Sequence, residues 1–91
     1  MPKKAEDKHK IFLRVRKIQG QVQAIERSLD QEKPCTEILQ QICAVRGAIN
    51  GLMNEVLEIH LKDSLVVGET TEQQRHDELT EISKILKSYL K

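Results

Sequence analysis

Apolar side chains recur at alternating steps of three and four residues along two long stretches of the chain. The first set consists of Ile11, Val15, Ile18, Val22, Ile25 and Leu29. The second set consists of Ile38, Ile42, Val45, Ile49, Leu52, Val56 and Ile59. This spacing places each set on one stripe of a helix, in the pattern of a heptad repeat. It predicts one helix over about residues 5–29 and a second over about residues 35–65.

Turn-forming residues separate these two helices and set off a third. Pro34 cannot continue the first helix but suits the first turn of the second. Gly68 then ends the second helix, and Thr70 or Thr71 caps a third over about residues 71–90. We expect its buried side to carry Leu79, Ile82, Ile85, Leu86, Tyr89 and Leu90. The central helix would be roughly 45 Å long, which is longer than a monomeric globule of this size needs.

The composition agrees with an all-α chain of one domain over residues 1–91. Aromatic residues make up only 2% of the sequence, so β sandwiches, barrels and α/β nucleotide-binding folds are disfavoured. So short a chain leaves much apolar surface uncovered, and we expect a partner subunit to cover it. With no apolar run long enough to span a membrane and no secretory signal, we expect a cytoplasmic protein in which Cys35 and Cys43 are free thiols.

Basic residues are concentrated at the start of the chain. Residues 1–17 carry seven basic and two acidic side chains, whereas the rest carries eight basic and twelve acidic ones. Lys10, Arg14 and Lys17 form one stripe on the first helix, and Arg16 flanks it. The stripe can neutralise the phosphates of a polyanion, although a solvated basic face explains it equally well. The scarcity of aromatic side chains disfavours base stacking, so double-stranded DNA is the expected nucleic acid.

Cys35 and His60 lie on the same face of the predicted central helix. They are within about 20° of each other around its axis but roughly 37 Å apart along it, so they cannot meet within one chain. Two copies packed antiparallel about a two-fold axis would bring Cys35 of one chain beside His60 of the other. Small residues near the midpoint would let the helices approach closely, although ordinary tight helix packing also explains the glycines. These small residues are Ala44, Gly47, Ala48 and Gly51.

The N-terminus offers a second reactive group. Met1 is followed by Pro2, a sequence from which the initiator Met is commonly removed, and removal leaves a free secondary amine. Such an amine adds to an aldehyde and loses water to give an iminium ion, which a thiolate can attack to leave one methylene between nitrogen and sulfur. Cys35 is the candidate thiolate because a helix N-terminus favours negative charge. A retained Met1 or an inert Cys35 would each exclude this reaction.

Three segments of the chain carry a family resemblance: RVRKIQGQVQAIERSLD, PCTEILQQICAVRGAINGLMNEVLEIHL and ILKSYLK. Together they closely resemble the CsoR/RcnR family of small all-helical bacterial repressors, and the likeness extends over nearly the whole chain. It implies a tetramer, a dimer of antiparallel dimers, that binds operator DNA without a helix-turn-helix. It also implies an effector site between subunits whose occupation releases the DNA, with no cofactor.

The resemblance carries over four effector positions: Pro2 (with Lys3 after it), Cys35, His60 and Ser64. Serine is a poor ligand for soft or borderline metals, so the metal-binding set is incomplete. The combination resembles the formaldehyde-responsive branch, in which a methylene joins Pro2 of one subunit to Cys35 of another. His60 and Ser64 are then supporting residues, although a weak metal site of Cys35 and His60 stays open.

The resemblance therefore implies a formaldehyde-responsive repressor of formaldehyde detoxification genes. Arg14 and Lys17 match family positions that matter for DNA, and Lys10 and Arg16 extend that surface. The alternatives are a repressor that responds to Zn, Co, Ni or Cu and, in another class, a helical oligomerisation or adaptor module. The sequence has no acid-base pair at helical spacing in an apolar pocket, so an enzyme is the least expected class. We expect Cys43 to be a small buried apolar residue and His9 and His76 to lie on the surface.

Overall fold

The computed structural model describes residues 4–64 and 71–89, apart from the side chain of Ser64. These ranges contain three helices and no strand: α1 (Ala5–Asp30), α2 (Cys35–Ser64) and α3 (Glu72–Tyr89). The predicted all-α class with a long central helix is confirmed. The C-terminal ends of α2 and α3 adjoin residues that lie outside the described ranges. The expected stop at Gly68, the alternative cap Thr70 and the apolar Leu90 lie outside the described residues.

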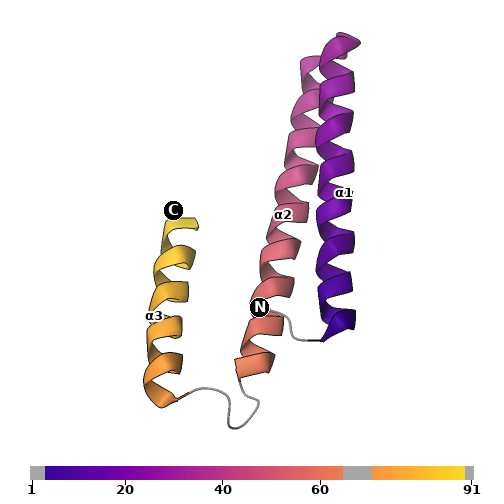
Figure 1. Ribbon diagram of the computed structural model, residues 1–91. Coiled ribbons are helices and arrows are strands. Elements are labelled where there is room, and N and C mark those ends of the chain that lie inside the picture. The colour runs from indigo at the N-terminus through magenta and orange to yellow at the C-terminus, as the bar shows by residue number, and fades with distance from the viewer. Residues whose placement is uncertain (1–3, 65–70, 90–91) are drawn as a thin grey trace.

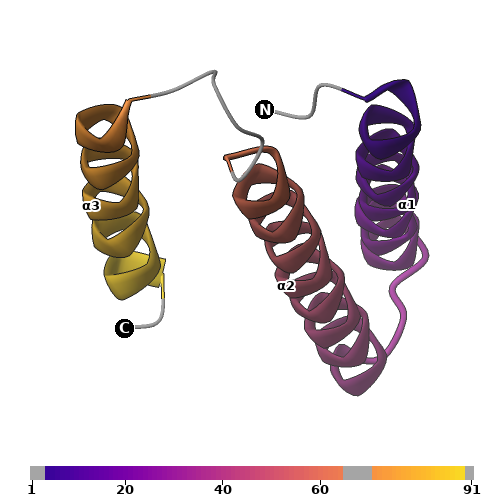
Figure 2. The same cartoon turned by 90° about the horizontal axis from the view of Figure 1, so that it is seen from below.

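The three helices lie side by side in one layer. α2 is in the middle, α1 runs antiparallel along one side of it, and α3 runs antiparallel on the other side (Figures 1 and 2). The Cα atoms span 55 × 31 × 13 Å, so the molecule is much thinner in one direction than in the other two. Protein domains normally enclose their core between two packed layers, and this chain supplies only one.

A hydrogen-bonded corner joins α1 to α2. The amide of Lys33 donates to the carbonyl of Ser28 at 2.9 Å, and the amide of Glu32 donates to the carbonyl of Leu29 at 3.2 Å. This is the Schellman pattern, in which the residue after the cap adopts a left-handed conformation. That residue is Glu32, with φ of 53°, where most helices of this type have glycine. Pro34 follows, so α1 ends and α2 begins within five residues.

A capping box starts α3. The hydroxyl of Thr71 accepts a hydrogen bond from the amide of Gln74 at 3.1 Å, and the side-chain oxygen of Gln74 accepts one from the amide of Thr71 at 2.9 Å. Two amides that the first turn leaves without helical partners are satisfied in this way. Of the two predicted caps, Thr71 is therefore the one that serves.

α1 and α2 together form an antiparallel helical hairpin. Polar contacts set the register of the two helices along one edge of this hairpin. In each pair the two residue numbers add up to the same total, as straight antiparallel helices in constant register require. Asp7 and Ser28 are buried, so these two residues are shielded from water, whereas Arg14 is 46% exposed. The pairs are Lys62 Nζ with Asp7 Oδ2 at 4.0 Å, Arg14 Nε with Glu55 Oε1 at 3.7 Å, and Gln41 Nε2 donating to Ser28 Oγ at 2.9 Å.

The heptad stripe of α2 is divided between two faces. Ile38, Val45, Leu52 and Ile59 are covered to different degrees on the α1 side, and Ile59 is 5% exposed. The alternate members Ile42, Ile49 and Val56 are 48%, 39% and 38% exposed. On α3, the expectation of a buried apolar side is wrong for Leu79, Ile85 and Tyr89, which are 54%, 59% and 39% exposed. A helix in a single layer has a neighbour only at its edge, so the rest of its apolar surface stays open.

The surface area measures how incomplete this chain is by itself. It exposes 7352 Å², whereas a compact monomer of 10.5 kDa exposes about 5,400 Å². Its radius of gyration is 17.2 Å, against about 12 Å for a compact domain of this length. Ile59 is the sole buried apolar residue within the described ranges. A stable fold therefore needs further apolar surface to be covered.

Glu32→Gly is expected to stabilise the protein by about 0.5–1 kcal/mol, because glycine removes the cost of the left-handed conformation and loses part of that gain in backbone entropy. Urea unfolding monitored by circular dichroism measures the change. The matched control is Gln31→Gly, one residue earlier at φ of −84°, where glycine should destabilise. Equal effects at the two positions would contradict the assigned corner.

Candidate functional site

Cys35 is the first residue of α2, and its thiol is free and exposed. The carbonyl of Pro34 accepts hydrogen bonds from the amides of Glu37 at 3.0 Å and Ile38 at 3.2 Å, which opens the helix. His60 lies at the other end of the same helix of 30 residues, so the two side chains are separated by roughly 37 Å of helix axis. Within one chain they do not form a common site.

The other end of α2 gathers the remaining described parts of the predicted site. α1 begins there, because Asp7 in its first turns pairs with Lys62 near the end of α2. The start of α3 also lies at this end, as Figure 1 shows. Pro2 and Lys3 lie outside the described residues, and Ser64 is described only as the last residue of α2. The hairpin therefore separates Cys35 from both His60 and the first turn of α1.

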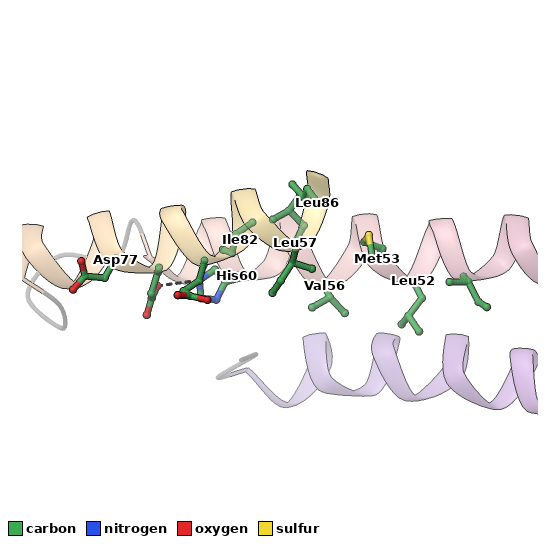
Figure 3. Close-up of a pocket in the computed structure, with 12 residues that line it drawn as sticks. Leu52, Met53, Val56, Leu57, His60, Asp77, Ile82 and Leu86 are labelled. Carbon is green, nitrogen blue, oxygen red and sulfur yellow. Dashed lines mark hydrogen bonds and ion pairs between the residues drawn. The ribbon is translucent and has the colours of Figure 1, made fainter. Parts of the chain in front are cut away.

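His60 is bound to α3. Its Nε2 donates a hydrogen bond to Glu78 Oε2 at 3.0 Å, with the imidazole 25% and the carboxylate 43% exposed (Figure 3). This bond assigns the proton to Nε2 and orients the ring. Glu78 was not predicted, because no periodicity along the chain reveals which residue of a third helix will face His60. Tyr89 donates a second hydrogen bond across the same gap, to Asn50 Oδ1.

An apolar groove of about 660 Å³ lies between α2 and α3. His60 and Glu78 lie towards one end of it, and the side chains of Leu52, Val56 and Ile82 line its length (Figure 3). Within residues 4–64 and 71–89, no three His, Cys, Asp or Glu side chains are grouped so that they would hold a metal ion. One protomer thus presents a single imidazole beside an apolar surface.

The basic stripe divides into two parts. Arg14 reaches across to α2, where its Nε lies 3.7 Å from Glu55 Oε1. Lys10 lines a small polar pocket together with Glu55 and Glu58, and Arg16 and Lys17 are exposed. Sequence reasoning found the cations but not the acids beside them, although Glu55 and Glu58 follow Gly51 at helical steps of four and three.

The other candidate ligands are placed as follows. Cys43 is an exposed free thiol, so the expectation that it is buried is wrong for the protomer. The reason is again the single layer, because Cys43 lies on a part of α2 that neither α1 nor α3 covers. His9 and His76 are exposed, as expected.

Comparison with known proteins places this geometry in a family. The metal-sensitive transcriptional repressors match residues 7–88. The chain belongs to this family, the CsoR/RcnR repressors. It is 48% identical over 85 residues to the transcriptional repressor RcnR of Citrobacter koseri, covering 93% of each chain. An uncharacterized Serratia marcescens protein from the bioA 5′ region is 46% identical over 85 residues, with the same coverage.

A solved structure resembles the whole repressor fold. It is a variant of the formaldehyde-responsive regulator FrmR from Salmonella enterica serovar Typhimurium, 58% identical, with a TM-score of 0.86 over 97% of this chain and 99% of that one. CsoR/RcnR proteins are transcriptional regulators rather than enzymes, and they bind DNA as oligomers. Within the described part of the chain, no helix is both long and apolar enough to cross a membrane.

The bonds of His60 and Tyr89 lead to a prediction about α3. Combining Glu78→Ala with Tyr89→Phe should speed amide exchange in α3 about tenfold or more, since each of the two hydrogen bonds contributes about 1 kcal/mol. Hydrogen exchange with mass spectrometry measures this, helix by helix. Asp77→Ala is the control, because Asp77 accepts a hydrogen bond from Gln73 within α3. Unchanged exchange in the double variant would mean that other contacts hold α3.

Proposed function

We propose that this repressor releases DNA when formaldehyde joins Pro2 of one subunit to Cys35 of another. The observation that carries the proposal is the polarity of the hairpin: Cys35 lies at one end, and His60 and the start of α1 lie at the other. A second protomer in antiparallel orientation brings Cys35 to the end where α1 begins. The likeness to a formaldehyde-responsive regulator over almost the full chain supports the same effector.

The chemistry needs only formaldehyde and the two protein groups. The secondary amine of Pro2 attacks the carbonyl carbon, and the adduct loses hydroxide as water to give an iminium ion. The Cys35 thiolate then adds to the iminium carbon, so a C–S bond forms and the nitrogen regains its lone pair. Overall, one amine proton and one thiol proton leave with the oxygen as water, and each crosslink adds one carbon atom. Removal of Met1 is required.

The repressor acts as a homotetramer, a dimer of antiparallel dimers. The surface that the protomer exposes beyond that of a compact monomer, about 1,900 Å², is more than the roughly 800 Å² that each partner of a standard interface buries. The open face of α2 and the apolar side of α3 supply it. In this assembly His60, oriented by Glu78, and Ser64 support Cys35 of the partner.

The DNA-binding surface is the basic stripe of Lys10, Arg14, Arg16 and Lys17. In four copies it lies against double-stranded operator DNA and neutralises phosphates. The crosslink draws the N-terminal arm and the start of α1 towards the partner and re-aims this stripe. Formaldehyde acts only as far as it favours that non-binding conformation. The regulated genes are those of formaldehyde detoxification, and the protein works in the cytoplasm.

A metal-responsive repressor is the second candidate, favoured by the likeness to RcnR and by the family description. Cys35 and His60 would be the ligands. One observation weighs against it: Ser64 offers a poor donor for borderline metals. The bond from His60 to Glu78 does not, because metal-bound histidines commonly donate their other ring nitrogen to a carboxylate. Membership of a repressor family leaves no observation that favours an adaptor module.

Treatment of the Met1-free protein with near-stoichiometric formaldehyde should add the mass of one carbon atom per chain, mapped by fragmentation to Pro2 and Cys35. Cys35→Ala should lose both this adduct and the release of DNA by formaldehyde. Cys43→Ala is the matched control, since it removes the other exposed thiol of α2. DNA release by Zn²⁺ or Ni²⁺ with no response to formaldehyde would support the metal alternative instead.

Arg14→Ala and Lys17→Ala should each weaken binding to DNA of any sequence and lower the slope of log K against log salt by about 1 for each phosphate that is no longer neutralised. Fluorescence anisotropy at several salt concentrations measures both quantities. Arg27→Ala, an exposed cation in the last turn of α1, should leave the slope unchanged. Equal losses for all three variants would contradict a specific stripe.

A further inference from the structure

The guanidinium of Arg14 lies against α2 beside Gly51 and Glu55, and these two residues form its seat. Its Nε lies 3.7 Å from Glu55 Oε1, and its Nη1 lies where a side chain at Gly51 would be, 2.8 Å from the position of an added Cβ. An added Cβ at Gly20 or Gly47 would have nothing within 4 Å. Gly51 and Glu55 are four residues apart and therefore share one face of α2. The glycine provides the space for the guanidinium, and the glutamate provides its counter-ion.

Acidic side chains of α2 lie at and near this seat, on the edge where α1 and α2 meet. The Glu55 carboxylate is 21% exposed and the Arg14 side chain 46% exposed, so water screens the pair only in part. Glu58 lies one turn further along α2 and shares a small polar pocket with Glu55 and Lys10. The acids of α2 thus lie directly beside two cations of the basic stripe.

A carboxylate and a DNA phosphate offer a guanidinium the same kind of oxygen acceptors. The Nε and Nη1 atoms of Arg14 already face α2, so a phosphate that uses this edge must displace Glu55. We propose that the seat formed by Gly51 and Glu55 competes with DNA for Arg14 and so holds down the affinity of the repressor. This inference rests on the proposed function, because it takes Arg14 to be a DNA contact.

The competition has a consequence for recognition. Phosphate contacts carry no sequence information, so the seat lowers binding to all DNA by a similar factor. Base-edge and shape contacts at the operator are not reduced in this way. Glu55 is therefore a positioning residue that lowers the overall affinity for DNA and leaves the ratio of operator binding to random binding unchanged.

The test uses the full-length protein and a short mixed-sequence DNA duplex, so that no operator needs to be known. Glu55→Gln should tighten binding about threefold to fivefold, the range expected when an ion pair of up to about 1 kcal/mol no longer competes. Glu58→Gln is the matched control, since it removes an equal charge one turn away from the seat. Gly51→Ala should also tighten binding, because its Cβ displaces the guanidinium without a change of charge.

A double-mutant cycle separates the seat from general charge effects. In an Arg14→Ala background, Glu55→Gln should change affinity no more than Glu58→Gln does. A full effect in that background, equal effects of the two glutamates, or weaker binding by Glu55→Gln would each overturn the inference. Sedimentation velocity checks assembly, and if Gly51→Ala dissociates the oligomer, Glu55→Gln and the cycle decide the question alone.

The salt slope distinguishes failure of this inference from failure of the proposed function. If the function holds and the seat does not, Arg14→Ala still lowers the slope while Glu55→Gln has no specific effect. If Arg14→Ala, Lys17→Ala and Glu55→Gln all leave DNA binding unchanged, the basic stripe is not the DNA surface. Both proposals then fail together.

Discussion

A single layer of three helices cannot enclose a core, and the rest of the structure follows from that constraint. α1 covers one edge of α2 and α3 approaches the other, so Ile59 alone among the described apolar residues is buried. The uncovered part of the α2 heptad stripe is the surface on which a second copy would lie. The same constraint applies to the chemistry, because the hairpin places Cys35 and His60 at opposite ends. If the proposed function holds, folding and effector binding depend on the same association of subunits.

Local signals in the sequence predicted the helices well because each signal acts within a few residues. Heptad spacing located α1 and α2, Pro34 located the break between them, and Thr71 capped α3 as one of two candidates. The separation of Cys35 from His60 was predictable too, since the rise of a helix is constant. Contacts between helices were not: Glu78 at His60 and Glu55 at Arg14 depend on how two helices are aligned and rotated. A stripe of apolar residues identifies a face but not the neighbour that covers it, as the exposure of Ile85 and Cys43 illustrates.

The chain resembles both a formaldehyde-responsive regulator and RcnR, so the fold alone does not determine the effector. The identity of a few side chains would determine it. The bond from His60 to Glu78 is compatible with either effector, because a metal-bound histidine commonly donates its other ring nitrogen to a carboxylate and a methylene crosslink does not involve the imidazole. Ser64 adds no thiolate or imidazole at the end of α2. The same scaffold can therefore serve different effectors according to which donors lie near the end of the hairpin.

The corner between α1 and α2 determines how a pull on α1 is transmitted. The amides of Glu32 and Lys33 are bonded back to α1, Pro34 has no amide, and the carbonyl of Pro34 is bonded forward into α2. These bonds hold the end of α1 next to the start of α2. In the proposed mechanism, a pull on α1, which has 26 residues and is about 39 Å long, would tilt the whole helix about this corner. A shift of a few ångströms at its free end then becomes a small rotation of the whole helix, which moves Lys10 further than Lys17 because Lys10 lies further from the pivot.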